Sequence, residues 1–105
     1  MMRITVWQQN GTAPPNTSPG AAIAAFNDAV AALRKVSGAG DVQWGFGHGG
    51  IVTVGHPTNY AAADAILKDP AVQASVAKIL ALGIGITEDY FVTTPQQVLP
   101  FVPKQ

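Results

Sequence analysis

The sequence predicts an α+β fold in which strands and helices follow one another in the order βαββαβ. The chain of 105 residues is long enough for one domain and too short for two ordinary ones. Four short segments are rich in β-branched and aromatic residues, and two longer ones repeat apolar residues at helical spacing. Turn residues separate these segments, so each pattern predicts one element.

The first predicted strand covers residues 3–8. Its side chains alternate between two faces, with Ile4 and Val6 on one face and Thr5 and Trp7 on the other. Large apolar groups therefore point to both sides of this strand.

A long loop and the first helix come next. Residues 9–17 contain turn-forming asparagine, glycine and proline pairs, which are typical of a surface loop. Ser18 is predicted to cap the helix and Pro19 to occupy its first position, where proline loses no hydrogen bond. The helix is expected to run to about Val36. Four apolar residues share its inward face: Ile23, Phe26, Val30 and Leu33.

The second and third strands are predicted at residues 42–46 and 51–56. The glycine-rich residues 47–50 between them tolerate positive φ, so the two strands form a hairpin. Residues 45–50 also match the G-x-G-x-x-G string of dinucleotide sites. A strand follows them here, whereas that site requires a helix, so the hairpin is the favoured interpretation.

The second helix is predicted to be broken. Thr58 or Asn59 can cap its first part, and Pro70 ends that part because proline cannot continue the hydrogen-bond ladder. Asp69 caps a second part that runs to about Leu82. The inward residues of this part are Val72, Val76, Ile79 and Leu80.

The last strand is predicted at residues 89–93, and a proline-bearing tail occupies residues 95–105. The whole chain is then a single domain, with a core of about residues 3–94. With right-handed crossovers, the predicted order gives one four-stranded antiparallel sheet with both helices on one face. This is the ferredoxin-like sandwich.

The sheet face away from the helices carries apolar groups and needs a cover. A second subunit packed sheet to sheet would form a closed dimeric α/β barrel. If one subunit hides about 800 Å² of apolar surface, the gross gain is on the order of 20 kcal/mol before association costs. We therefore expect a homodimer.

Composition narrows the classes of function. The chain is 48% hydrophobic and only 11% charged, which argues against disorder. Its net charge of +0 lacks the basic excess that binds nucleic acid, and its Cys count of 0 excludes disulfides and thiolate metal sites. No apolar run reaches the length of a membrane span, so a cytoplasmic protein is expected.

Two segments carry a resemblance to known proteins. Residues 50–57, Gly-Ile-Val-Thr-Val-Gly-His-Pro, and residues 68–73, Lys-Asp-Pro-Ala-Val-Gln, resemble the third strand and broken second helix of dimeric α/β-barrel proteins. That superfamily includes small cofactor-independent monooxygenases, lactone isomerases and proteins of unassigned role. Many members carry a tryptophan and acidic residues just after the third strand, where His56-Pro57-Thr58-Asn59 stands here, so no catalytic residue is carried over.

The candidate catalytic group lies where the third strand meets the second helix. His56 is followed by Tyr60 and Asp64 at spacings of four. His56 could accept a proton, Asp64 could fix its tautomer and Tyr60 could bind a substrate oxygen. The alternative is structural: His56 ends a strand, Tyr60 packs on the rim and Asp64 favours the positive helix terminus.

The candidate ligand-binding residues are aromatic. Trp7, Trp44 and Tyr90 could line a cavity inside the barrel, or they could be ordinary core and interface residues. His48, on the glycine-rich turn, could reach over a pocket. His48 and His56 lie at opposite ends of one strand, about 25 Å apart by strand rise, so no metal site is expected.

The sequence thus favours a homodimer that binds a small apolar or aromatic molecule. As an enzyme it would be a cofactor-independent monooxygenase or isomerase, because no metal, thiol or nucleotide motif is visible. The alternative is a non-enzymatic ligand-binding or assembly module.

Overall fold

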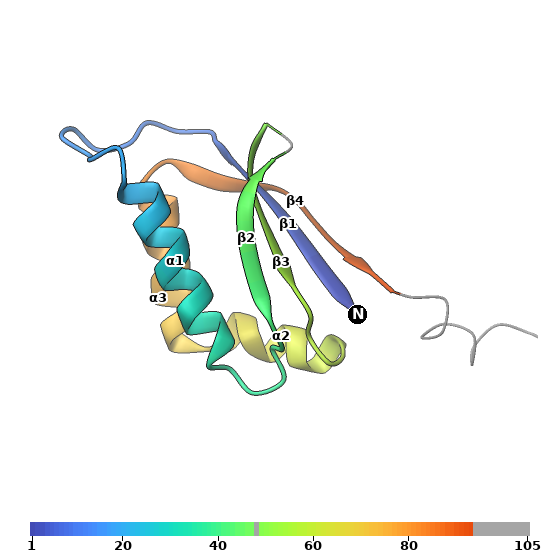
Figure 1. Ribbon diagram of the computed structural model, residues 1–105. Coiled ribbons are helices and arrows are strands. Elements are labelled where there is room, and N and C mark those ends of the chain that lie inside the picture. The colour runs from blue at the N-terminus through green and yellow to red at the C-terminus, as the bar shows by residue number, and fades with distance from the viewer. Residues whose placement is uncertain (48, 94–105) are drawn as a thin grey trace, which may run out of the picture.

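In the computed structural model, which describes residues 1–47 and 49–93, the strands form one antiparallel sheet in the order β2-β3-β1-β4. The helices lie on one side of it (Figure 1). This arrangement confirms the predicted α+β ferredoxin-like fold. His48 and the predicted tail lie outside the described residues. The elements are β1 Met2–Gln9, α1 Ala21–Arg34, β2 Val42–Gly47, β3 Gly50–Gly55, α2 Tyr60–Lys68, α3 Pro70–Ala81 and β4 Ile84–Val92.

Helix α1 begins later than predicted. Its N-cap is Gly20, which has no side-chain cap, so the prediction that Ser18 caps the helix is wrong. The Ser18 carbonyl instead accepts a hydrogen bond from the Ala21 amide at 3.1 Å. That bond makes Pro19 and Gly20 the middle of a turn that leads into the helix. The helix also ends at Arg34 rather than Val36.

The predicted break between α2 and α3 is confirmed. Asn59 caps α2 through its Oδ1 atom, which accepts from the Ala62 amide at 2.8 Å. Asp69 Oδ1 accepts from the amides of Ala71 at 3.0 Å and Val72 at 3.1 Å. Pro70 follows at the first helical position, where it loses no bond.

Strand β4 begins at Ile84 rather than at Asp89, and it contains a β-bulge. Val6 of β1 lies opposite Glu88, but the next residue, Trp7, lies opposite Ile86. Thr87 is therefore the extra residue of β4. Before the bulge the even-numbered residues of β4 face the helices, and after it the odd-numbered ones do.

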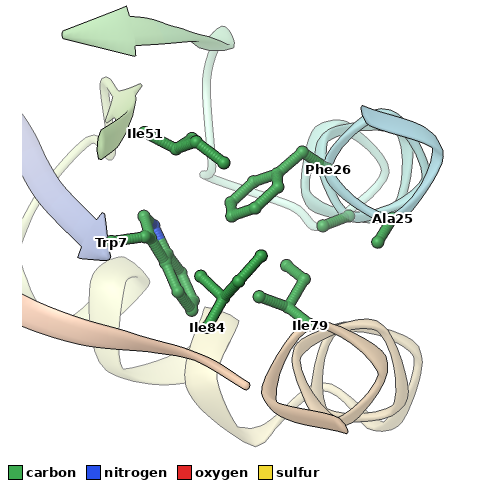
Figure 2. Packing of buried hydrophobic residues seen from close by; sticks show 7 residues of the cluster. Trp7, Ala25, Phe26, Ile51, Ile79 and Ile84 are labelled. Carbon is green, nitrogen blue, oxygen red and sulfur yellow. The ribbon is translucent and has the colours of Figure 1, made fainter. Parts of the chain in front are cut away.

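The core between the sheet and the helices consists of two clusters. The aromatic cluster is built around Trp7, Phe26, Ile79 and Ile84, whose side chains converge in Figure 2. The small-residue cluster consists of Ala39, Ile66 and Val72.

Two residues predicted to face the core do not do so. Ile23 of α1 is 45% exposed and Leu80 of α3 is 53% exposed. Both residues lie at the edge of the apolar face of their helix. The face that packs against the sheet is narrower than the one predicted from the spacing of apolar residues.

The opposite face of the sheet is covered by none of the described helices (Figure 1). The strand registers place a set of apolar side chains there: Met2, Ile4, Val52, Val54, Tyr90 and Val92. We call this set the open face. Tyr90 is 45% and Val92 44% exposed.

Candidate functional site

A cavity of about 140 Å³ lies between the sheet and the helices, where the two core clusters meet. Its helix side is lined by apolar residues of α1 and α3, among them Leu33, Val72 and Val76. Val76 packs against both clusters. The cavity is therefore part of the helix–sheet core of one chain and lies on the other side of the sheet from the open face.

Small residues leave this space empty. Ala29, Ala39 and Gly55 all line the cavity. Gly55 lies in β3 opposite Arg3 of β1, so no side chain from β3 fills the sheet floor at that point. Two large rings, Trp7 and Phe26, also line the cavity, and Phe26 is fully buried in the aromatic cluster.

The sheet side of the cavity carries a polar group of three residues. Arg3 and Thr5 line the cavity from β1, and both bind Asp89 of β4. The Arg3 guanidinium donates from Nε to Asp89 Oδ1 at 3.0 Å and from Nη2 to Oδ2 at 2.6 Å. The Thr5 hydroxyl donates to Asp89 Oδ1 at 2.9 Å. The result is a two-pronged ion pair, the strongest form of such a contact.

The Arg3 side chain is fixed from a second direction. Its Cζ atom lies 5.5 Å from the centre of the Phe91 ring, a cation–π distance. Phe91 in turn packs edge-on against Tyr60, with ring centres 5.1 Å apart. Arg3, Phe91 and Tyr60 thus connect the sheet to the start of α2.

The ion pair changes the acidity of Asp89. The pKa of this carboxyl is lowered from its usual range, chiefly because Arg3 donates hydrogen bonds to the ionised form. Partial burial acts in the opposite direction, and the Thr5 hydroxyl and the positive charge of Arg3 lower the pKa further. Asp89 is therefore ionised at neutral pH and is a weak base.

Of the three predicted ligand-binding residues that the structure describes, Trp7 alone lines the cavity. Its indole Nε1 donates to Thr53 Oγ1 at 3.1 Å, and its ring packs edge-on against Phe26 with centres 5.4 Å apart. The condition for a shared aromatic cavity, that Trp7 and Tyr90 face the same side of the sheet, is not met. Trp7 faces the helices, whereas Tyr90 lies on the open face.

Trp44 is on the same side of the sheet as Trp7 but packs outside the cavity. Its Nε1 donates to Asn27 Oδ1 at 2.9 Å, and its ring lies 5.5 Å from that of Phe26. The three aromatic residues therefore do not surround one space.

The predicted group of His56, Tyr60 and Asp64 is not assembled. The His56 ring places Nδ1 3.3 Å from the Asp41 carbonyl oxygen, so the ring contacts this backbone group and not the Asp64 carboxylate. Among the described residues, no hydrogen bond or ion pair joins these three side chains. All three are exposed and none lines the cavity. A role of His56 as a base stays a prediction.

Sequence reasoning missed Arg3, Thr5 and Asp89. A signal for the first two was present, because they alternate with Ile4 and so share a face with Trp7. Asp89 gave no such signal, because the bulge at Thr87 changes the facing of β4.

Two kinds of feature are absent from the described residues. Within residues 1–47 and 49–93, no helix is long and apolar enough to cross a membrane. The same residues contain no group of three or more histidine, cysteine or acidic side chains that could hold a metal ion.

No protein-family model and no curated protein sequence matches this chain. Several solved structures, however, superimpose on it. The Arabidopsis thaliana protein At3g17210 superimposes with a TM-score of 0.64 at 12% identity, over 89% of this chain and 94% of that one. A dimeric ferredoxin-like protein of unknown function from Jannaschia sp. CCS1 gives 0.59 at 17% identity, over 88% and 100%.

A variant of SnoaB, a cofactor-independent oxygenase from Streptomyces nogalater, gives a TM-score of 0.58 at 14% identity, over 90% of this chain and 93% of that one. Identities this low establish the fold alone. The chain has the ferredoxin-like fold that dimeric proteins of unknown function and a cofactor-independent oxygenase share.

Proposed function

We propose that this protein binds a small apolar or aromatic molecule in the helix–sheet cavity and oxidises it as a cofactor-independent monooxygenase. The observation that carries the proposal is the apolar cavity of about 140 Å³ with a fixed guanidinium in its wall. Engineered apolar cavities of about 150 Å³ stay dry and bind benzene, so this space suits one aromatic ring. The likeness to SnoaB supports oxygenation as the chemistry.

Monooxygenation without a cofactor makes few demands on the protein. The substrate supplies all the electrons: in the oxidation of a phenol to a quinone, one oxygen atom enters the ring as a carbonyl and the other leaves as water. The protein must exclude water, admit dioxygen and stabilise the negative charge that develops on the substrate oxygen. The apolar lining offers the ring a surface that binds water poorly, and the Arg3 guanidinium in the wall offers N–H donors to the substrate oxygen.

Isomerisation by proton transfer is less well supported. A general base works best with a pKa near the working pH. Arg3 is the only ionisable residue among the described residues that line the cavity, and it is a permanent cation. Asp89 is the nearest carboxylate bound to the lining residues, and its lowered pKa makes it a weak base.

The test is dioxygen consumption with a panel of single-ring phenols. The blocking variant is Val76→Phe, which places a ring in the cavity, and the control is Ala77→Phe, which places the same ring on an exposed position of α3. We expect consumption above the rate of autoxidation in the wild type and the control only. Equal rates in Val76→Phe and the control would contradict the proposal.

The second candidate is a binding module without turnover. The observation that favours it is the lack of a neutral-pH base among the described lining residues. In that case the same phenols bind, and Val76→Phe abolishes binding, but dioxygen is not consumed.

We also propose that the protein is a homodimer through the open face. Its exposed apolar residues support this, as do two structural neighbours that are described as dimeric. Tyr90→Lys is expected to yield monomers in sedimentation velocity at micromolar concentration. Ile23→Lys is the matched control, because Ile23 and Tyr90 are both 45% exposed but Ile23 lies on a helix. A dimer that survives Tyr90→Lys would argue against this interface.

A further inference from the structure

We infer that Arg3 makes the cavity selective for a single-ring molecule that carries a neutral oxygen acceptor, such as a phenol, and against the corresponding carboxylate. This inference rests on the proposed use of the cavity as a ligand site. It adds the chemical class of the ligand and the residue that recognises it.

The number of rings follows from the volume. Sites for drug-sized ligands occupy roughly 300–1,000 Å³, whereas this cavity offers about 140 Å³. One ring with a short substituent fits this volume, whereas a second fused ring would extend beyond it.

The hydrogen bonds of Arg3 show which of its N–H groups can donate to a ligand oxygen. A guanidinium has five N–H donors, and Asp89 takes one from Nε and one from Nη2. Nη1 donates to no acceptor among the described residues. Asp89 and Phe91 fix the position of the guanidinium, so little side-chain freedom remains to be lost when a ligand binds.

The other polar groups of the cavity wall are partly engaged. The Thr5 hydroxyl donates to Asp89, and Thr53 Oγ1 accepts from Trp7. The Thr53 hydroxyl proton remains as a weaker, neutral donor beside the cavity. The charged donor that distinguishes an oxygen-bearing ring from a hydrocarbon ring is therefore Arg3.

The negative charge of Asp89 favours a neutral ligand over an anionic one. Its carboxylate already balances the positive charge of Arg3 at 2.6 Å. A ligand carboxylate at the same guanidinium would add a second anion beside Asp89 and lose its own hydration in an apolar space. A neutral oxygen accepts from Arg3 without that repulsion.

The test compares three probes of similar ring size: toluene, phenol and benzoate. Binding is followed by NMR at the indole N–H of Trp7, which lies in the cavity wall. The indole of Trp44 lies outside the cavity and serves as the internal control for folding. The variants are Arg3→Met with Asp89→Asn, which removes both charges, and Arg3→Lys, which keeps an ion pair with Asp89 but lacks the fork of donors.

We expect the ratio of phenol affinity to toluene affinity to fall about tenfold or more in the double variant, which is the usual size of a hydrogen bond to a charged group. Arg3→Lys should show a smaller fall, and benzoate should bind the wild type more weakly than phenol. A ratio unchanged in both variants, or tighter binding of benzoate, overturns the inference while toluene binding still supports a ligand cavity. If no probe shifts the Trp7 resonance, both proposals fail.

Discussion

The aromatic cluster and the small-residue cluster share one helix–sheet interface but fill it differently. In the aromatic cluster, the fully buried Phe26 ring contacts both tryptophan rings, with centres 5.4 and 5.5 Å apart. In the small-residue cluster, the buried side chains are Ala39, Ile66 and Val72, and a cavity adjoins them. Dense packing around Phe26 can hold the sheet and helices together while the junction of the two clusters retains space for a ligand.

The largest expected effect comes from removing the ring at the centre of the aromatic cluster. Phe26→Ala should lower the free energy of unfolding by about 3–5 kcal/mol, because it combines lost burial with a new cavity. Val72→Ala, in the small-residue cluster, should cost only about 1.5–2 kcal/mol, since two carbon atoms leave a site that already borders empty space. Urea unfolding measures both. Equal losses of unfolding free energy in the two variants would mean that the two clusters contribute equally to stability.

A smaller effect is expected from filling the space between the clusters. Val76→Leu adds one methylene group beside the cavity and should raise the free energy of unfolding by up to about 0.8 kcal/mol. The same change should weaken toluene binding at the Trp7 indole. Thermal unfolding measures the change in stability, and the NMR titration measures the change in toluene affinity. A loss of stability would show that the cavity is already closed to an added methyl group.

The smallest effect concerns the polar wall of the cavity. The folded-state pKa of Asp89 is below its unfolded value of about 3.8, so its ion pair stabilises the protein above that pH, and this contribution is lost as the pH falls through the folded pKa. Because the pair is partly exposed, we expect about 0.5 kcal/mol or less. Asp89→Asn should therefore differ from the wild type in urea midpoint at pH 6 and approach it below pH 3. A difference in urea midpoint that persists below pH 3 would indicate that Asp89 stabilises the fold by something other than its charge.

Several parts of the fold could be predicted because their causes are local. The capping asparagine and aspartate and Pro70 mark the ends of α2 and α3 directly, since each acts on amides within three residues. The early start of β4 could not be predicted in this way. Gly83 and Gly85 resemble a turn, but Gly85 lies within the strand, where an added Cβ would collide with the Asn10 side chain.

The site was less predictable than the fold. The spacing of His56, Tyr60 and Asp64 suggested a group, but sequence spacing across a strand end and a helix start does not fix where the side chains point. The ion pair of Arg3 and Asp89 joins residues 86 positions apart. The cavity itself arises from the combined volumes of side chains on several elements, which no single segment reveals.

The bulge at Thr87 makes β4 sensitive to the length of the chain. One added or deleted residue near this position would exchange the two sets of side chains beyond it, so that Glu88 and Tyr90 would point at the helices and Asp89 and Phe91 away from them. Arg3 would then lose its partner, although every residue type in the strand was kept. Substitutions in this segment should therefore be tolerated in evolution far more readily than insertions or deletions, and gaps between relatives are expected in the loops at either end of the strand.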